Sequence, residues 1–168
     1  MSAFAAALSA SLGQMVAALS RKKKSQSAHV DRLSEQLEAL RKAADAFAEA
    51  IDRDASAYDA VMAAFKLPQG DTEETRHREE AIQAATKGAA EVPLEVAEKA
   101  ARLCQQLQQL ETIAAASMKS DLEVARLMAV AGAKGALANV EINLEGLKDT
   151  AYIASVRARV DELRNRLG

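Results

Sequence analysis

The sequence has 168 residues and a formal net charge of −2, which fits one domain and gives no reason to expect nucleic acid or a membrane as a partner. Alanine occurs 39 times, aromatic residues make up only 3%, and there are 7 Gly and 2 Pro. This composition argues against a β-sandwich or barrel and predicts an all-α fold in a single domain, residues 1–168. The single cysteine, Cys104, excludes an intramolecular disulfide and a Cys-based zinc site, so a reducing, cytoplasmic setting is expected.

Helical spacing of apolar residues predicts a first helix over the first 20 residues. Serines interrupt this stretch, and the positive charges follow it rather than precede it, so neither a signal peptide nor a membrane span is expected. Small Ala and Ser residues surround the large ones, which indicates a helix buried on most sides in the middle of a bundle. The expected stripe consists of Phe4, Leu8, Leu12, Met15 and Leu19.

A second, longer helix is predicted from Val30 to Phe65, followed by the helix breakers Pro68 and Gly70. Its apolar residues follow alternating steps of three and four, which is typical of a helix that packs along one seam. Asp54 occupies a place that this seam otherwise reserves for an apolar side chain. The seam consists of Val30, Leu33, Leu37, Leu40, Ala44, Phe47, Ile51, Tyr58, Val61 and Phe65.

Asp54 is therefore a candidate for chemistry. A carboxylate that faces a core loses solvation of its charged form, which favours the protonated acid that proton transfer at neutral pH uses. The alternative is a buried Asp that a neighbouring Arg or Lys holds to fix the helix register. Asp52 and Asp59 fall outside the seam and are expected to be solvated.

Capping and turn signals predict three or four further helices. One covers Thr72–Val92, and a separate helix begins at Pro93, a residue suited to a first helical turn. Ser120 with Glu123 fits a capping box that opens a helix running to about Asn143. The expected architecture is a bundle of five to six helices. The last helix is amphipathic and carries Ile153, Val156, Val160, Leu163 and Leu167.

The helix expected after Ser120 places polar side chains on a face of small residues, which suits a flat ligand. The structural alternatives are that Ser120 only caps the helix, that Asp121 only complements the helix dipole, and that the small residues only admit a neighbouring helix. The face consists of Asp121, Ala125, Met128, Gly132, Ala136, Asn139 and Asn143.

Residues 1–29 carry four cations, Arg21 to Lys24, and no acid. This basic run is either a solvated loop at a helix end or a site that attracts carboxylates or phosphates. His29 and His77 have no acid or Cys at metal spacing, and the sequence contains no P-loop, dinucleotide-binding or nucleophile-elbow motif. Neither a metal nor a nucleotide cofactor is expected.

Seven segments follow one another in a specific order: Met15-Val16 with the basic run, Asp54 with Ala57-Tyr58, Met62 to Pro68, Thr72-Glu73-Glu74, Val92-Pro93-Leu94, Ser120-Asp121 and Asn139 to Leu144. In this order and spacing the chain resembles the cyclodeaminase/cyclohydrolase family, from about Ser2 to Asp149. That family comprises the C-terminal domain of formiminotransferase-cyclodeaminase and bacterial methenyltetrahydrofolate cyclohydrolases.

The resemblance implies a dimeric α-helical bundle that binds tetrahydrofolate derivatives in a helix-lined cleft without a metal. It implies hydrolysis of 5,10-methenyltetrahydrofolate to 10-formyltetrahydrofolate, or cyclisation of 5-formiminotetrahydrofolate with loss of ammonia. The single domain favours the cyclohydrolase. Both reactions pass through a tetrahedral carbon between N5 and N10, so both need a positioned acid or base and polar groups that orient the pterin.

The resemblance and the periodicity together assign roles to seven residues. One of two carboxylates is expected to transfer the proton, three polar residues to bind the substrate, and two lysines to attract its glutamate carboxylates. In that order they are Asp54 and Asp121; Ser120, Asn139 and Asn143; and Lys22 and Lys23.

The chain departs from the family at three places: it begins Met1-Ser2-Ala3 where the family has a Gly-rich turn, has Ala114-Ala115 in place of a Gly-Asn pair, and has Ser56 in place of an acid. Two alternatives to the enzyme therefore stay open. One is a non-catalytic helical protein that dimerises through its long second helix and binds a partner. The other is an inactive folate-binding paralogue.

Overall fold

The computed structural model describes residues 1–167, and these residues form helices and contain no strand. This confirms the all-α prediction. Two short 3-10 segments, Lys24–His29 and Ala116–Met118, connect helices. The five α-helices are α1 (Ser2–Arg21), α2 (Val30–Phe65), α3 (Thr72–Glu111), α4 (Lys119–Glu145) and α5 (Thr150–Leu167).

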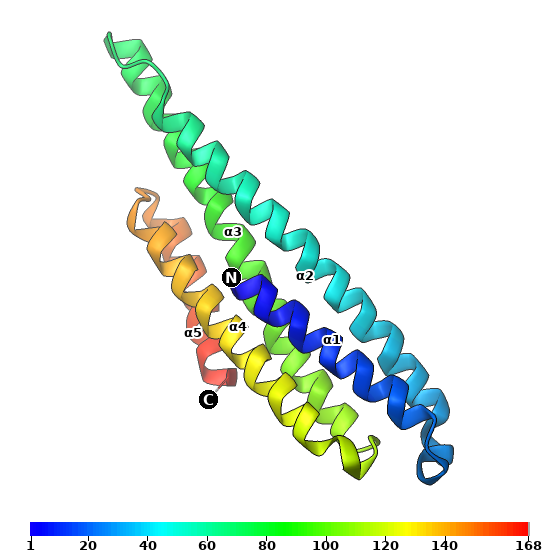
Figure 1. Cartoon of the computed structure of the whole chain (residues 1–168). Coiled ribbons are helices and arrows are strands. Elements are labelled where there is room, and N and C mark those ends of the chain that lie inside the picture. Colours follow the sequence, from blue (N-terminus) through cyan, green and yellow to red (C-terminus); the bar gives the residue numbers. More distant parts are fainter. Residues whose placement is uncertain (168) are drawn as a thin grey trace.

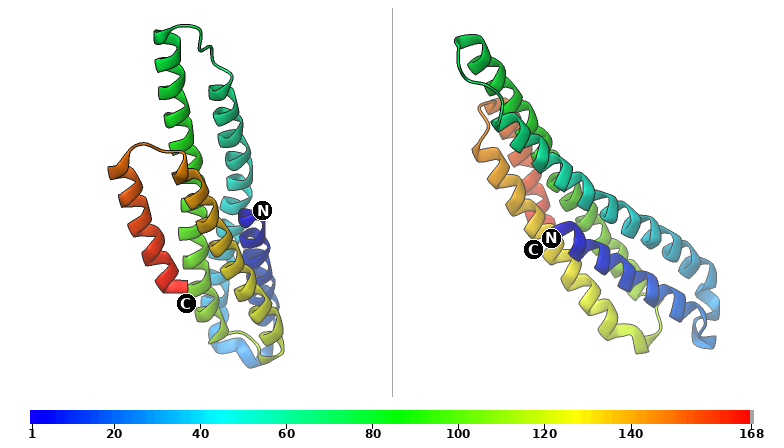
Figure 2. Two further views of the ribbon diagram at one scale, coloured as in Figure 1. Left: turned by 90° about the vertical axis from the view of Figure 1, so that its left-hand side faces the viewer. Right: turned by 45° about the horizontal axis from the view of Figure 1, so that its top comes forward.

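The bundle is elongated because α2 and α3 form one long antiparallel hairpin (Figure 1). Helices α1 and α4 lie side by side against the lower part of this hairpin, and the hairpin tip projects beyond them. Helix α5 packs on the outer side of α3 and α4 (Figure 2). The second half of α2 thus lacks the cover that α1 gives to the first half, and this difference positions the candidate site.

Helix α1 corrects the first prediction, because its small residues face the core and its large residues face outward. Phe4 is 49% exposed and Leu8, Met15 and Leu19 are each 38–40% exposed. Small side chains let α1 approach α2 and α4 closely. The helix is long and apolar enough to cross a membrane by length and composition, with a mean hydropathy of 1.5. The residues buried in the bundle are Ala3, Ala6, Ser9, Ala10, Gly13, Val16, Ala17 and Ser20.

Two buried serines of α1 are satisfied by hydrogen bonds to distant parts of the chain. Ser9 Oγ donates to the carbonyl of Ala125 on α4 at 2.7 Å. Ser20 Oγ accepts from the backbone N–H of Ala115 at 3.0 Å. A buried hydroxyl costs stability unless it is paired, so these bonds also fix the position of α1 along α4.

Helix α3 runs unbroken through Pro93, whereas the sequence predicts one helix ending at Val92 and another beginning at Pro93. A proline inside a helix lacks the N–H that would bond to the carbonyl four residues earlier. The chain tolerates Pro93 because the freed carbonyl, that of Ala89, finds another donor, Asn143 Nδ2 at 3.1 Å. The helix therefore continues to Glu111.

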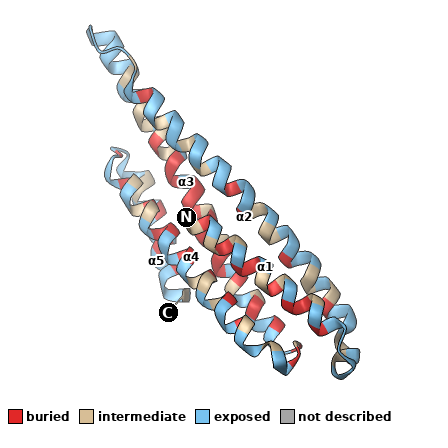
Figure 3. Cartoon of the chain, in the orientation of Figure 1, coloured by how far each residue is buried: buried red, intermediate tan, exposed pale blue. Residues whose placement is uncertain are grey.

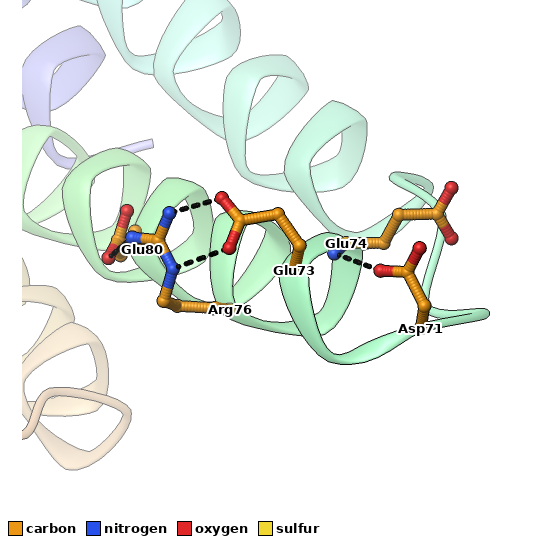
Figure 4. A network of polar contacts seen from close by, with 5 residues as sticks. All are labelled: Asp71, Glu73, Glu74, Arg76 and Glu80. Carbon is orange, nitrogen blue, oxygen red and sulfur yellow. Dashed lines mark hydrogen bonds and ion pairs between the residues drawn. The ribbon is translucent and has the colours of Figure 1, made fainter.

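A side chain caps the start of α3. Asp71 accepts the N–H of Glu74 at 2.8 Å (Figure 4). The Glu74 carboxylate also accepts the N–H of Gly70, the residue before the cap, at 2.8 Å. Arg76 pairs with acids one turn away on the same helix, Glu73 and Glu80 (Figure 4).

Helix α4 begins at Lys119 after the 3-10 segment, and no side chain caps it. The prediction that Ser120 and Glu123 form a capping box is therefore wrong. The preceding 3-10 turn, in which the N–H of Met118 bonds to the carbonyl of Ala115 at 2.8 Å, leads into the helix one residue before Ser120.

The apolar seam of α2 is buried only where α1 covers it. Leu33, Leu40 and Phe47 are at most 1% exposed, whereas Tyr58 is 64% and Phe65 is 49% exposed. The prediction of one continuous buried seam is thus wrong for the second half. Figure 3 shows the same change along the helix, with buried positions concentrated where α2 lies beside α1.

Polar contacts attach α5 to α3. Arg159 pairs with Glu98 at 2.7 Å, and Lys87 pairs with Asp149 at 2.6 Å. Tyr152 Oη donates to a carboxylate oxygen of Glu91 at 2.7 Å, and partial burial together with this bond raises the pKa of the Tyr152 hydroxyl. The apolar residues Val156, Val160 and Leu163 are buried, as the amphipathic pattern predicts.

Candidate active site

An open groove lies where the second half of α2 faces α3 and α4, beyond the start of α1. It offers about 580 Å³ of space, which is enough for a flat bicyclic ligand. One wall is apolar and the opposite wall carries carboxamides. The lining residues are Ile51, Asp54, Ala55, Tyr58, Val61, Ala89, Asn139 and Asn143.

Asp54 lines the groove and also a much smaller pocket of about 30 Å³ that adjoins the first residues of α1. Its side chain is half-buried rather than enclosed in the core. Among residues 1–167 no Lys or Arg forms an ion pair with it, which does not favour the alternative of a register-fixing ion pair. The expected exposure of Asp52 and Asp59 is confirmed.

Two hydrogen bonds fix the orientation of the Asn143 carboxamide. Its Nδ2 donates to the carbonyls of Ala89 and Asn139, both at 3.1 Å. Two carbonyl acceptors require the NH₂ end of the carboxamide, so Oδ1 is the atom left for a ligand. Pro93 is the cause of this arrangement, because it leaves the Ala89 carbonyl without a helical donor. The half-buried Asn139 lies one turn earlier and lines both pockets.

Two glycines of α4 let the start of α1 reach the site. A Cβ at Gly132 would lie 3.0 Å from the carbonyl oxygen of Ser2, and a Cβ at Gly135 would lie 2.8 Å from Ser2 Oγ. Because both positions lack a Cβ, the first turn of α1 can pack directly on α4. That contact places Met1 and Ser2 in the pocket that also holds Asp54 and Asn139.

The sequence interpretation missed the apolar wall of the groove. The apolar spacing of α2 places Ile51, Tyr58 and Val61 on its packing seam, but in the structure they line the groove. Helix length is the signal that identifies them. Helix α2 has 36 residues and α1 only 20, so α1 is too short to cover the whole apolar seam of α2. Tyr58 offers an aromatic face to a planar ligand.

The remaining predicted residues lie at the other end of the bundle. Lys22 and Lys23 follow the last residue of α1, and Ser120 and Asp121 belong to the first turn of α4. Asp121 and Asn143 are 22 residues apart on one helix, which separates them by about 33 Å. The prediction that they share a face along α4 does not bring them to one site within a single chain.

Among residues 1–167, no group of three or more His, Cys, Asp or Glu side chains lies close enough to hold a metal ion. Cys104 is half-buried against the core, and this burial raises the pKa of its thiol. The thiol is thus disfavoured as a thiolate nucleophile. The groove residues are the ones that offer a carboxylate, carboxamides and an aromatic ring together.

Comparison with known proteins identifies the family to which the fold belongs. The family model described as formiminotransferase-cyclodeaminase matches residues 1–162. The chain belongs to the formiminotransferase-cyclodeaminase family. The crystal structure of formiminotetrahydrofolate cyclodeaminase from Thermotoga maritima superposes with a TM-score of 0.85 at 25% identity, covering 99% of this chain and 79% of that one.

Curated relatives carry two kinds of enzyme name. Methenyltetrahydrofolate cyclohydrolase of Methylorubrum extorquens is 35% identical over 172 residues, which is 98% of this chain and 78% of that protein. Formimidoyltransferase-cyclodeaminase of Rattus norvegicus is 35% identical over 164 residues, and that of Sus scrofa is 39% identical over 110 residues. The chain spans only 30% and 20% of these two proteins. The comparisons confirm the resemblance stated from the sequence.

Proposed function

We propose that this chain catalyses a one-carbon reaction of tetrahydrofolate in the groove between α2, α3 and α4. The reaction is hydrolysis of 5,10-methenyltetrahydrofolate to 10-formyltetrahydrofolate or cyclisation of 5-formiminotetrahydrofolate with loss of ammonia. The observation that supports it best is the presence of Asp54, Asn139 and Asn143 around one groove in the fold of this family. The names of the relatives do not favour the non-catalytic alternative.

Asp54 is proposed to transfer the proton. In the hydrolysis, water adds to the carbon between N5 and N10 and loses a proton, and the C–N5 bond then breaks as N5 takes up a proton. In the cyclisation, N10 adds to the formimino carbon, and the bond to the terminal nitrogen breaks as ammonia leaves. One carboxylate can accept a proton in the first half of either reaction and return it in the second. The position of Asp121 at the far end of α4, away from the groove, supports Asp54 rather than Asp121 in this role.

The carboxamides and the apolar wall are proposed to orient the pterin. Asn143 presents Oδ1 as an acceptor because its Nδ2 is already bonded, so it suits an N–H donor on the ring. Tyr58 and Ile51 provide a flat apolar surface on the opposite side. A ligand held between them has its reacting carbon fixed relative to Asp54, which is the main requirement for an addition step.

The proposal includes a homodimer in the cytoplasm that needs no metal or other cofactor. The outward-facing apolar residues of α1 support the dimer, since a helix in water normally places polar residues on its outer face. The reaction supports the absence of a metal requirement, because the carbon attacked is already activated by two nitrogens. Equal turnover before and after dialysis against a chelator is the expected result.

Assays with the two substrates separate the two reactions. For hydrolysis, the purified protein is mixed with 5,10-methenyltetrahydrofolate, and the loss of its ultraviolet absorbance is compared with the spontaneous rate. For cyclisation, 5-formiminotetrahydrofolate is supplied, and ammonia and the methenyl absorbance are measured as they appear. Acceleration of either reaction supports the proposal and identifies the activity. Saturable folate binding without acceleration of either would instead establish the inactive paralogue.

A further inference from the structure

A small pocket lies beside the groove, at the point where the start of α1 meets α2, α3 and α4 (Figure 1). Its volume is about 30 Å³, against about 580 Å³ for the groove. Since one water molecule needs roughly 10 to 15 Å³ of such space, the pocket has room for one or two molecules of that size and for nothing much larger. Asp54 and Asn139 line both the pocket and the groove, so they lie at the boundary between the two.

The pocket combines a few polar side chains with a mostly apolar wall. Ser2, Asp54 and Asn139 are its polar lining residues. A buried water needs about two to four hydrogen-bond partners, and these three side chains meet that need. Within residues 1–167 the Asp54 carboxylate and the Asn139 carboxamide form no hydrogen bond or ion pair with another side chain, so both are available to a bound molecule. The remaining lining residues are Met1, Ala3, Ala50, Val92, Pro93, Val96 and Ala136.

The size of the pocket is set by backbone and by short side chains. Ser2 lies so close to α4 that a Cβ at Gly135 would be 2.8 Å from its Oγ. Ala136, one residue further along α4, is fully buried, and Ala50 and Val96 on the other walls are each 3% exposed. Because close-packed groups of this kind have little freedom to move aside, the pocket selects its occupant by size.

Both reactions of the proposed function exchange a molecule of this size with the folate. In the hydrolysis, water forms a bond to the carbon between N5 and N10. In the cyclisation, the bond between the same carbon and the terminal nitrogen breaks, and ammonia leaves. Water and ammonia both donate and accept hydrogen bonds, so the same carboxylate and carboxamide suit either molecule.

We propose that the small pocket holds the small reactant between Asp54 and Asn139, which is water in the hydrolysis and ammonia in the cyclisation. The inference rests on the proposed function, since it takes the neighbouring groove as the place where the folate binds. Asp54 and Asn139 are the residues that the two spaces share, so they contact the small reactant and the folate carbon at the same time.

The pocket gives each proton a defined route. As water in the pocket forms the C–O bond, one of its protons passes to the Asp54 carboxylate and then to N5 when the C–N5 bond breaks. The second proton leaves as the carbonyl forms, and it is the proton that hydrolysis of the methenyl cation releases. In the cyclisation of the formiminium cation, the N10 proton passes through Asp54 to the terminal nitrogen, which departs as ammonia into the pocket. Asn139 holds the small molecule in place by hydrogen bonding.

A substitution that fills the pocket tests the assignment. Val96 lines the pocket but not the groove, so Val96→Ile adds one carbon to a space of about 30 Å³ and leaves the lining of the groove unchanged. Whichever reaction the wild type accelerates is expected to lose about 10²-fold in kcat, because its small reactant is displaced. KM for the folate is expected to stay within about twofold of the wild type. A wild-type kcat, or a raised KM with unchanged kcat, would overturn the proposal.

Two further variants separate lost space from damage to the fold. Val156→Ile makes the same substitution at a buried position of α5, outside the pocket, and is expected to keep the wild-type kcat. Val92→Ala removes two carbons from another wall of the pocket. In the Val96→Ile background it is expected to raise kcat again by about tenfold or more. Absence of this rescue would contradict the proposal, since lost space would then not be the cause.

A high-resolution crystal structure of the wild-type protein tests the pocket without any turnover. It is expected to show an ordered water at hydrogen-bond distance, about 2.6–3.2 Å, from the side chains of Asp54 and Asn139. The Val96→Ile structure is expected to lack that water. A wild-type pocket without ordered water would overturn the inference. An ordered water in a protein that accelerates neither reaction would instead contradict the proposed function and leave the pocket as a water site.

Discussion

The contact between Asn143 and the Ala89 carbonyl gives a sharp prediction about how the groove is built. Asn143→Ala removes the donor that replaces the N–H missing at Pro93, so a partly buried carbonyl is left without its hydrogen bond. An unsatisfied group of this kind costs about 1 to 3 kcal/mol. In a chain of this length each kcal/mol lowers Tm by about 2–4 °C.

The double variant Pro93→Ala, Asn143→Ala tests whether Pro93 is the reason that the Asn143 hydrogen bond stabilises the fold. Pro93→Ala restores an N–H that can bond to the Ala89 carbonyl within α3, which makes the Asn143 bond redundant there. The stability cost of Asn143→Ala is therefore expected to be smaller by about 1 kcal/mol in the Pro93→Ala background than in the wild type. Urea denaturation of the four proteins measures this coupling. An equal cost in both backgrounds would refute the argument that Pro93 positions Asn143.

Two further predictions concern the fold. Gly13→Ala is expected to lower the free energy of unfolding by about 1–3 kcal/mol, because its Cβ would lie 2.7 Å from a methyl of the fully buried Leu107. Gly88→Ala has nothing within 4 Å of its Cβ and is expected to stabilise α3 by up to about 1 kcal/mol. Thermal melts of the two variants measure the difference, and equal Tm values would contradict the packing argument. Lys99 beside Glu95 holds the pKa of that carboxyl below its usual 4.5, so the pair stabilises the fold above that pH and the contribution is lost as the pH falls through the lowered pKa. Glu95→Gln is therefore expected to be less stable than the wild type near pH 7 and to lose less stability on acidification. Thermal melts at several pH values measure this, and an equal dependence of Tm on pH in the two proteins would contradict a stabilising ion pair.

The sequence predicts the helices well because their apolar periodicity is long and regular. The pattern from Val30 to Phe65 gives one helix with the observed bounds, and Asp54 is recognised because it interrupts that pattern. Pro93 is misread because helix propensity treats a proline as a boundary, whereas a tertiary donor, Asn143, compensates for it. Such compensation comes from a residue 50 positions away and has no local signal in the sequence.

Helix α1 is misread for a different reason. Periodicity identifies two faces, one of large and one of small apolar residues, but it does not say which face packs against the bundle. In a chain with 39 alanines the helices pack closely through small residues, so Phe4 and Leu8 are left outside. The same limit applies to the site. Helical spacing places Asp121 and Asn143 on one face, but the 22 residues between them separate them by about 33 Å along α4, so a shared face is not a shared site.

The turnover of the Asp54→Asn variant tests the central claim most directly. The claim is that the groove between α2, α3 and α4 converts the folate and that Asp54 transfers the proton. The variant replaces the carboxylate with a carboxamide of nearly the same shape, so folate binding is expected to persist while kcat falls by about 10² to 10⁴. Asp52→Asn, at an exposed position two residues earlier, is expected to keep wild-type turnover. Near-normal turnover of Asp54→Asn would contradict the account.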